Sequence, residues 1–263
     1  MTATASAHDT AAFDRWFETF VPNESNATVL CFPYSGSGAS MFGPWRKLIH
    51  PRVRLAALRL PGRESLLNQP PRDHLLSTAD EIAGVIAADR TVDGAADGRL
   101  FLVGFSLGGL MAFEVARGLR QRDVRIDLLV AASCRAPQGR LGRGSLHKLS
   151  DDRFLKQLHK QYGAVPDAVW NNDELKRLLL PMLRADIKMF ETYEYRDQPP
   201  LDCELLALAG RRDRQVKAKH VAAWREQASS FRHRSFDADH YLTRTHASAV
   251  VETINRRIDR LLP

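Results

Sequence analysis

The stretch FLVGFSLGGLMAFEVA, residues 101–116, decides the fold class. An apolar, strand-like run ends in Gly104-Phe105-Ser106-Leu107-Gly108 and passes directly into residues that favour a helix. This G-x-S-x-G pattern is typical of a nucleophile elbow, a tight strand-to-helix turn that exposes a serine hydroxyl at the edge of a sheet. The alternative is that Ser106 is only a small residue at a strand-to-helix junction.

Short apolar runs alternate with longer helical segments along the 263 residues. Such alternation predicts an α/β fold with a mostly parallel central sheet, helices on both faces and right-handed crossovers. We expect strands at 28–33, 53–60, 99–105, 126–133, 203–210 and 231–237, and helices at 76–89, 107–121, 217–228 and 246–262.

One interval, residues 136–200, contains helix signals but no predicted strand. Ser150 and Asn172 each precede acidic residues as helix N-caps do, and Pro181 is expected to end or kink the second helix, which would restart there. We therefore expect an α/β core of residues 1–135 and 201–263 with a helical insertion at 136–200. The insertion should form a lid, because ligands of open α/β sheets bind at the carboxyl edge. A helical subdomain that packs only on itself is the alternative.

Composition and charge exclude several classes of function. The chain carries 38 Lys and Arg against 31 Asp and Glu, but no zinc-finger or other nucleic-acid motif accompanies this charge, so no nucleic acid partner is expected. No apolar run is long enough to span a membrane and the first residues lack the features of a signal peptide, so we expect a cytoplasmic protein with no membrane partner. Cys31, Cys134 and Cys203 have no metal-ligand spacing and are expected to be buried thiols.

A serine with its ordinary pKa is a weak nucleophile, so Ser106 needs a histidine base. In proteins with this elbow the base comes last in the chain, after the acid. His240 is favoured because it follows the last predicted strand in the loop FDADHYL, residues 236–242. His220 and His233 fall inside a predicted helix and strand, and His246 falls at the start of the last helix.

The acid that orients the histidine is expected at the end of a strand. Asp213 lies just beyond the strand at 203–210, in the loop before the next helix, and is favoured. Asp237 and Asp239 compete with it, but side chains so close to His240 in sequence rarely reach the geometry that orients an imidazole.

An oxyanion hole is expected from the loop CFPYSGSGAS, residues 31–40, whose glycines allow the backbone to approach a ligand closely. One donor should be the N–H of Leu107, directly after the nucleophile, and the other the N–H of Ser35 or, less favoured, of Tyr34. Glycine-rich loops also bind phosphates, but neither G-x-G-x-x-G nor a Walker lysine occurs, so nucleotide binding is not expected.

Six ordered motifs resemble those of the type II thioesterases that serve polyketide and nonribosomal-peptide assembly lines. They are CFPYSGSGASMFGPW (31–45), LRLPGRES (58–65), VGFSLGGLMAFEVA (103–116), LRADIKMFETYEY (183–195), ALAGRRDRQV (207–216) and DHYL (239–242). The resemblance extends from residue 15 to the last helix. It implies an α/β-hydrolase fold, a triad of Ser106, Asp213 and His240, an oxyanion hole at Ser35 and Leu107, and a mobile lid over an acyl chamber.

The same resemblance implies hydrolysis of acyl thioesters on the phosphopantetheine arm of an acyl or peptidyl carrier protein, without a metal or redox cofactor. We expect a monomer whose substrate pocket includes Tyr34, Phe105, Met182, Met189 and Phe190. A carboxylesterase of small free esters and a non-catalytic carrier-docking or ligand-binding protein are the alternatives.

Two departures from the family pattern concern the site. Phe105 and Leu107 stand where many members have His and Met, so the shape of the pocket is expected to differ. Ala238 and Asp239 stand where members commonly have two glycines, which leaves a supporting role for Asp239 open.

Overall fold

A seven-stranded sheet runs through the centre of the computed structural model, which describes residues 11–22, 26–92, 98–139, 144–163 and 167–263. The strand order is β1-β3-β2-β4-β5-β6-β7, and every neighbouring pair is parallel except β1 with β3. The strands are β1 Phe17–Val21, β2 Ala27–Phe32, β3 Arg54–Leu58, β4 Arg99–Phe105, β5 Leu128–Ala132, β6 Leu201–Gly210 and β7 Ala228–Phe236.

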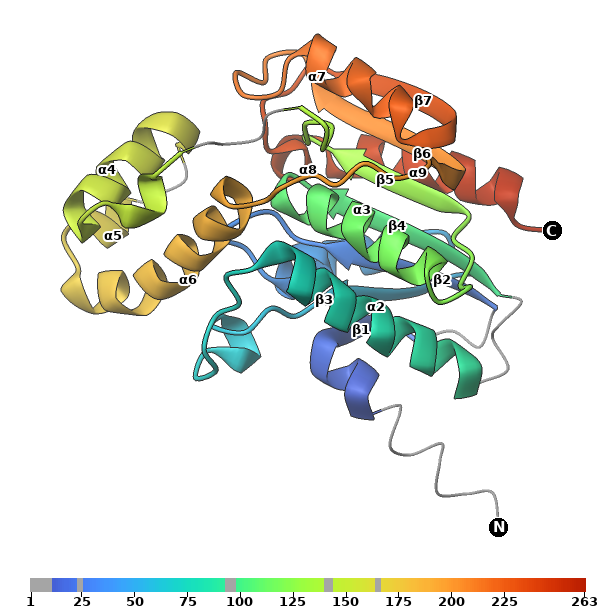
Figure 1. The fold of residues 1–263 in the computed structure, drawn as a ribbon, viewed down its shortest axis with the longest axis horizontal. Helices are drawn as coiled ribbons and strands as arrows, with labels where there is room; N and C mark the ends of the chain where they lie inside the picture. Colours follow the sequence, from blue (N-terminus) through green and yellow to red (C-terminus); the bar gives the residue numbers. More distant parts are fainter. Residues whose placement is uncertain (1–10, 23–25, 93–97, 140–143, 164–166) are drawn as a thin grey trace.

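Helices cover both faces of this sheet (Figure 1). The helices α2 (Leu75–Val92), α3 (Leu107–Arg120) and α7 (Ala218–Ala222) contribute to the apolar core on one face. On the other face the core is formed with the 3-10 helix η1 (Ala39–Lys47) and the last helix α9 (Ala247–Leu261). The expected fold class, a mostly parallel α/β sheet between helical layers, is confirmed.

Two local features of this core differ from what the sequence predicts. β1 was not predicted, because its five residues follow a helical segment without an intervening turn signal, and an edge strand needs no continuous apolar run. The helix expected at 217–228 consists instead of α7, a 3-10 turn η5 (Ala223–Glu226) and the start of β7.

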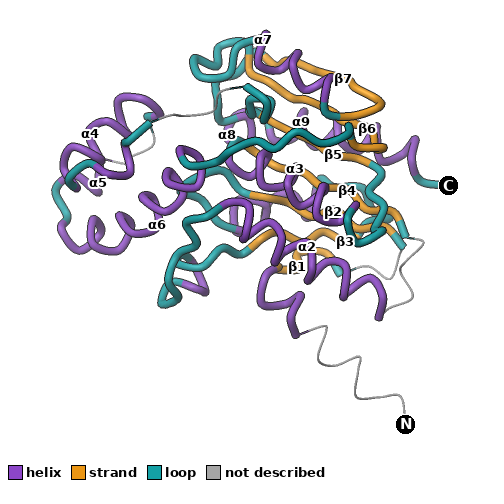
Figure 2. Tube along the Cα trace, in the orientation of Figure 1, coloured by secondary structure: helices purple, strands orange, loops and turns teal. Residues whose placement is uncertain are grey.

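The chain segment that follows β5 and precedes β6 forms a helical insertion to one side of the sheet (Figure 2). Its elements are η4 (Leu146–Lys148), α4 (Asp151–Tyr162), α5 (Asp167–Trp170) and α6 (Asp173–Glu191), and the described part of 136–200 contains no strand. Phe154, Leu158, Val169 and Leu180 belong to a small apolar core of its own.

The structure shows which of the two expected helix N-caps are formed and whether Pro181 ends the second helix of the insertion. Asn172 caps α6, because its side chain accepts hydrogen bonds from the N–H groups of Glu174 and Leu175, each at 3.0 Å. Ser150 occupies the N-cap position of α4 but makes no side-chain capping bond. Pro181 does not end α6, which continues to Glu191. Pro181 is exposed, so water can hydrate the carbonyl that lacks a partner in the preceding turn.

The three cysteines are buried and free, as expected. Within the described ranges no helix is long and apolar enough to cross a membrane.

Candidate active site

Ser106 lies at the tight turn between β4 and α3, with φ 52° and ψ −116°. A positive φ is uncommon for a residue other than glycine and marks local strain. The turn requires glycine on both sides. A Cβ on Gly104 would lie 2.1 Å from the carbonyl oxygen of Gly108, and one on Gly108 would lie 2.2 Å from that of Phe32. The sequence therefore allows α3 to approach β4 and β2 closely, and this approach sets the position of the serine.

Ser106, His240 and Asp213 form a continuous chain of contacts. His240 Nε2 lies 3.1 Å from Ser106 Oγ, and His240 Nδ1 lies 2.8 Å from Asp213 Oδ2. The other carboxylate oxygen of Asp213 accepts hydrogen bonds from the backbone N–H groups of Gln215 (2.7 Å) and Val216 (3.0 Å). The three side chains come from loops after β4, β6 and β7, at the carboxyl edge of the sheet. This is the geometry that a serine nucleophile, a base and an orienting acid require.

The pKa of Asp213 reflects this environment. Burial of the carboxyl group opposes its ionisation, but the hydrogen bond from His240, the charge of His240 and the two backbone N–H groups outweigh burial and lower the pKa below its ordinary value. Asp213 is therefore ionised at neutral pH and can hold the imidazole in one orientation.

The competing carboxylates point elsewhere. Asp239 Oδ1 accepts a hydrogen bond from the backbone N–H of Tyr241 at 2.9 Å, so it shapes the histidine loop without touching the imidazole. Asp237 is exposed and lies 3.5 Å from Arg212. The carboxylate that contacts His240 is that of Asp213.

The remaining candidate histidines lie in regular elements. His220 is in α7, where its Nδ1 accepts a hydrogen bond from the backbone N–H of Lys217 at 3.0 Å. His233 lies in β7 and stacks on Phe231. His246 occupies the N-cap position of α9.

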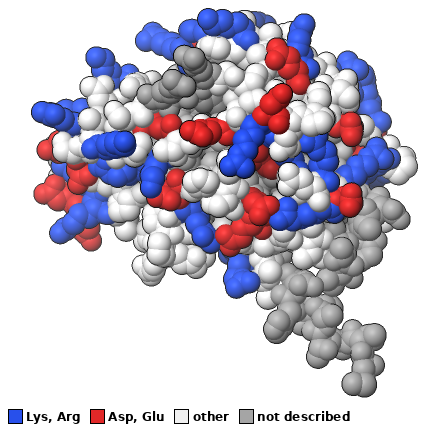
Figure 3. All heavy atoms as spheres, in the orientation of Figure 1, with Lys and Arg blue, Asp and Glu red and all other residues white. Residues whose placement is uncertain are grey.

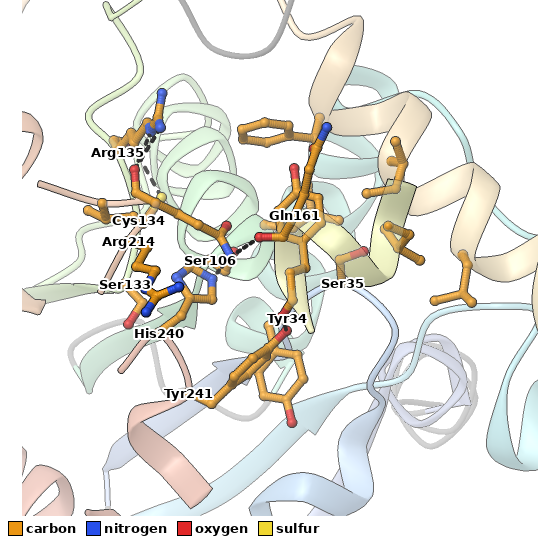
Figure 4. A pocket seen from close by; sticks show the side chains of 18 residues that line it. Tyr34, Ser35, Ser106, Ser133, Cys134, Arg135, Gln161, Arg214, His240 and Tyr241 are labelled. Carbon is orange, nitrogen blue, oxygen red and sulfur yellow. Dashed lines mark hydrogen bonds between the residues drawn. The ribbon is translucent and has the colours of Figure 1, made fainter. Parts of the chain in front are cut away.

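A cavity of about 370 Å³ opens beside Ser106 (Figure 4). One wall is apolar and comes from the insertion, with Leu158 on α4 and Leu183, Ile187 and Phe190 on α6. Polar and aromatic residues also line the cavity, namely Tyr34, Ser35, Ser133, Arg135, Gln161, Tyr162, Arg214, Gln215 and Tyr241. The insertion thus forms part of the chamber that contains the serine.

The structure places the five expected pocket residues in different surroundings. Tyr34 and Phe190 line the cavity, whereas Phe105, Met182 and Met189 do not. Phe105 packs with Phe42 and Trp45 in the apolar core that includes η1 and α9, because successive residues at the end of β4 point to opposite sides.

Met182 is buried in the small core of the insertion, and Met189 is buried in the core next to α2 and α3. A sequence signal for the apolar wall of the cavity is present in α6. Leu183, Ile187 and Phe190 are four and three residues apart, which places them on one helix face.

The expected oxyanion loop is a tight turn after β2. The N–H of Ser37 donates to the carbonyl oxygen of Tyr34 at 3.1 Å, and Gly36 between them has φ 80°. A glycine with positive φ at the third position is the pattern of a type II turn. Ser35 in this turn and Leu107 at the start of α3 both line the cavity. The first N–H groups of α3 have no acceptor within the helix and are available to a negative charge.

Cys134 also lines the cavity but is not an alternative nucleophile. Burial of its thiol raises the pKa to about 12, against smaller lowering effects of Arg135 and of the backbone at Leu110. A thiol with this pKa is almost fully protonated at neutral pH. Among the described residues, no group of three or more His, Cys, Asp or Glu side chains is placed to hold a metal ion.

A mostly parallel α/β sheet with a serine at a strand-to-helix turn, contacted by a histidine from the last loop, defines an α/β-hydrolase. Comparison with known protein families matches residues 27–258 to the thioesterase domain. The chain belongs to the thioesterase family.

Several known proteins are similar to this chain. The chain is 35% identical over 229 residues to thioesterase PikA5 of Streptomyces venezuelae, covering 86% of this chain and 79% of that protein. It is 30% identical over 231 residues to the gramicidin S biosynthesis protein GrsT of Aneurinibacillus migulanus, covering 87% and 88%. Among solved structures, YbtT, the type II thioesterase from the yersiniabactin NRPS/PKS pathway, superposes with a TM-score of 0.82 at 27% identity, covering 94% of this chain and all of that one.

Proposed function

We propose that this protein is a type II thioesterase that hydrolyses acyl thioesters on the phosphopantetheine arm of an acyl or peptidyl carrier protein in polyketide or nonribosomal-peptide biosynthesis. The observation that carries this proposal is the chain of contacts from Ser106 through His240 to Asp213 at an apolar cavity, in a member of the thioesterase family.

In the first half of the proposed reaction, His240 Nε2 takes the proton of the Ser106 hydroxyl as Oγ attacks the thioester carbonyl. The N–H groups of Ser35 and Leu107 stabilise the negative charge that develops on the carbonyl oxygen. The carbon–sulfur bond then breaks, and the imidazolium of His240 returns its proton to the thiolate. The products are the free carrier thiol and an acyl ester of Ser106.

In the second half, His240 takes a proton from water as the water oxygen attacks the acyl ester. The second tetrahedral intermediate uses the same two N–H groups, and its collapse returns the proton to Ser106 Oγ and releases the acid. Asp213 keeps the imidazole oriented and stabilises its charged form throughout. Protein groups and water supply every step, so the proposal includes no metal or redox cofactor.

The cavity walls support an acyl group as the substrate portion that enters. Leu158, Leu183, Ile187 and Phe190 offer apolar surface, whereas Arg135 and Arg214 bring positive charge to the same cavity. An alkyl or polyketide chain would bury apolar area against the insertion.

A carrier protein with an acidic surface is the proposed partner. Figure 3 shows Lys and Arg side chains along the edge of the molecule where α7 lies. The loop from β6 to α7 carries Arg211, Arg212, Arg214 and Lys217, and Arg214 also lines the cavity. Positive charge at this edge would speed the encounter with such a carrier. A monomeric state and a cytoplasmic location stay predictions.

The test compares hydrolysis of three substrates with the same acyl group: an acyl carrier protein, a short acyl thioester mimic and a nitrophenyl ester. We expect the highest kcat/KM on the carrier protein. A preference for the nitrophenyl ester would favour a carboxylesterase, and binding of the carrier without turnover would favour a non-catalytic protein. Ser106→Ala should reduce kcat by more than about 10³-fold on every substrate, while unchanged turnover would remove Ser106 from the mechanism.

A further inference from the structure

Arg63 and Asp186 form a buried ion pair between the core and the insertion. Arg63 follows β3 in the motif LRLPGRES, and Asp186 lies on α6 in the motif LRADIKMFETYEY. The side chains are 6% and 0% exposed. Arg63 Nη2 donates to Asp186 Oδ1 at 2.6 Å, and Nη1 donates to Oδ2 at 2.9 Å. Such a two-pronged pair fixes the relative position of two segments more firmly than a single contact.

The same two side chains hold the turn that contains Ser35. Asp186 Oδ2 accepts a hydrogen bond from the backbone N–H of Gly36 at 2.8 Å. Arg63 Nη1 donates to the carbonyl oxygen of Ser37 at 2.9 Å. Asp186 therefore accepts from an N–H of the turn and Arg63 donates to a carbonyl of the turn, so the two residues that follow Ser35 are both attached to this ion pair.

A purely structural role explains this arrangement poorly. Replacing a buried ion pair by apolar side chains of similar volume often leaves stability unchanged or improves it. Leu183 of α6 already lies close to the turn, since a Cβ added to Gly36 would be only 3.0 Å from Leu183 Cδ2. The feature that apolar residues would not reproduce is the pair of hydrogen bonds to the backbone of the turn.

We propose that Asp186, held by Arg63, is a positioning residue that fixes the turn of residues 34–37 so that the Ser35 N–H is directed at the reacting carbonyl oxygen. This inference rests on the proposed function, because it concerns the oxyanion hole of that reaction. The insertion then has a second role in addition to forming the apolar wall of the cavity. The carboxylate on α6 completes an oxyanion hole whose N–H donors both belong to the core.

The direct test is Asp186→Asn, with Asp127→Asn as the matched control. Asp127 is also a buried carboxylate that accepts from an arginine (Arg99, 2.6 Å) and from a backbone N–H (Leu100, 3.0 Å), but it lies at the amino ends of β4 and β5. We expect Asp186→Asn to lower kcat on an acyl thioester roughly ten- to a hundredfold, somewhat less than the loss of a whole oxyanion donor. KM should change by less than about threefold, and Asp127→Asn should leave kcat within about twofold.

A second readout separates positioning from general destabilisation. A boronic acid that forms a tetrahedral adduct with Ser106 mimics the oxyanion intermediate, so its affinity for Asp186→Asn should fall by about the same factor as kcat/KM. Substrate affinity measured with Ser106→Ala and with Ser106→Ala/Asp186→Asn should be equal. Boronate affinity that is unchanged in Asp186→Asn relative to the control, or a loss that appears equally in substrate affinity, would overturn the inference.

If Asp186→Asn does not fold, Arg63→Lys takes its place, because lysine retains the charge but not the simultaneous contacts to Asp186 and Ser37. The same selective loss in kcat and boronate affinity is expected, and wild-type values for both would contradict the inference. Wild-type protein that fails to hydrolyse any acyl thioester would instead reject the proposed function. The two failures are therefore distinguishable.

Discussion

The hydroxyl of Tyr241 donates a hydrogen bond to the carbonyl oxygen of Tyr162, 3.0 Å away, and so joins the residue after His240 to the last residue of α4. The ring of Tyr241 also packs edge-on against the rings of His240 (5.4 Å) and Tyr34 (5.3 Å). The histidine loop, the oxyanion loop and the insertion therefore meet at one aromatic side chain.

Tyr241→Phe should loosen the end of α4 without disturbing the triad, because the ring contacts stay and only the hydrogen bond is lost. We expect faster amide hydrogen exchange in the last turn of α4, and a kcat on a short thioester mimic within about threefold of wild type, since one such bond contributes about 1 kcal/mol. Tyr195→Phe, which removes a hydroxyl near Gln227 away from the cavity, is the control. Unchanged exchange in α4 would show that the bond does not hold the insertion.

Asp213→Asn should reduce kcat by about 10³–10⁴-fold, because the amide cannot hold and charge-stabilise the imidazole as the carboxylate does. Asp239→Asn should cost less than about fivefold, since an amide oxygen can still accept from the Tyr241 N–H. Steady-state kinetics on one acyl thioester measure both variants. A larger loss at Asp239 would reverse the assignment of the acid.

The lowered pKa of Asp213 predicts a pH-dependent contribution to stability. The folded pKa lies below the unfolded value of about 3.9, so the stabilisation is present above that value and is lost as the pH falls through the folded pKa. The difference in free energy of unfolding between wild type and Asp213→Asn should therefore decrease as the pH falls from about 5 through the folded pKa. Urea titrations across this range measure it, and parallel curves would argue against the shift.

Cys134 should resist alkylation although it lines the cavity. With a pKa of about 12, only about one thiol in 10⁴ is ionised at pH 8. Iodoacetamide at pH 8 should leave the activity intact, and Cys134→Ser should retain most of it, whereas a fluorophosphonate directed at Ser106 should inactivate the enzyme. Rapid inactivation by iodoacetamide that Cys134→Ser prevents would contradict the raised pKa.

Gly104→Ala should destabilise the fold by more than about 3 kcal/mol, because the added Cβ collides with the backbone of Gly108 rather than with a side chain that can move. Gly43→Ala is the matched control, since its Cβ would meet only the ring of Phe20 at 3.8 Å. Thermal unfolding compares the two variants. A stable Gly104→Ala variant would mean that the elbow can relax.

The sequence predicts the parallel sheet and the three side chains that meet at its edge because each of them lies in the turn or loop that follows a strand. Ser106, Asp213 and His240 come after β4, β6 and β7, and carboxyl ends of parallel strands share one edge. Strand periodicity and chain order are local signals, so this part of the site is accessible without a structure.

The parts that the sequence does not predict depend on tertiary packing. α6 contributes to the apolar cavity wall, to the insertion's core and to the main core, so its apolar residues face several directions. Periodicity alone cannot tell whether Met182 and Met189 face the cavity, the core of the insertion or the main core. The contact of Asp186 with Gly36 spans 150 residues and has no local signal except a carboxylate on an otherwise apolar face.

The buried pair also constrains how the protein can be engineered. Asp186 is part of the insertion, whereas Arg63 and Gly36 belong to the core. A chimaera that receives the insertion of a relative, in order to accept a different acyl chain, therefore has to bring an acidic side chain into the register of Asp186. Without this acidic side chain, the guanidinium of Arg63 would remain buried beneath the turn without a counter-charge. An exchange of the insertion that is meant to alter acyl selectivity would therefore also change the rate.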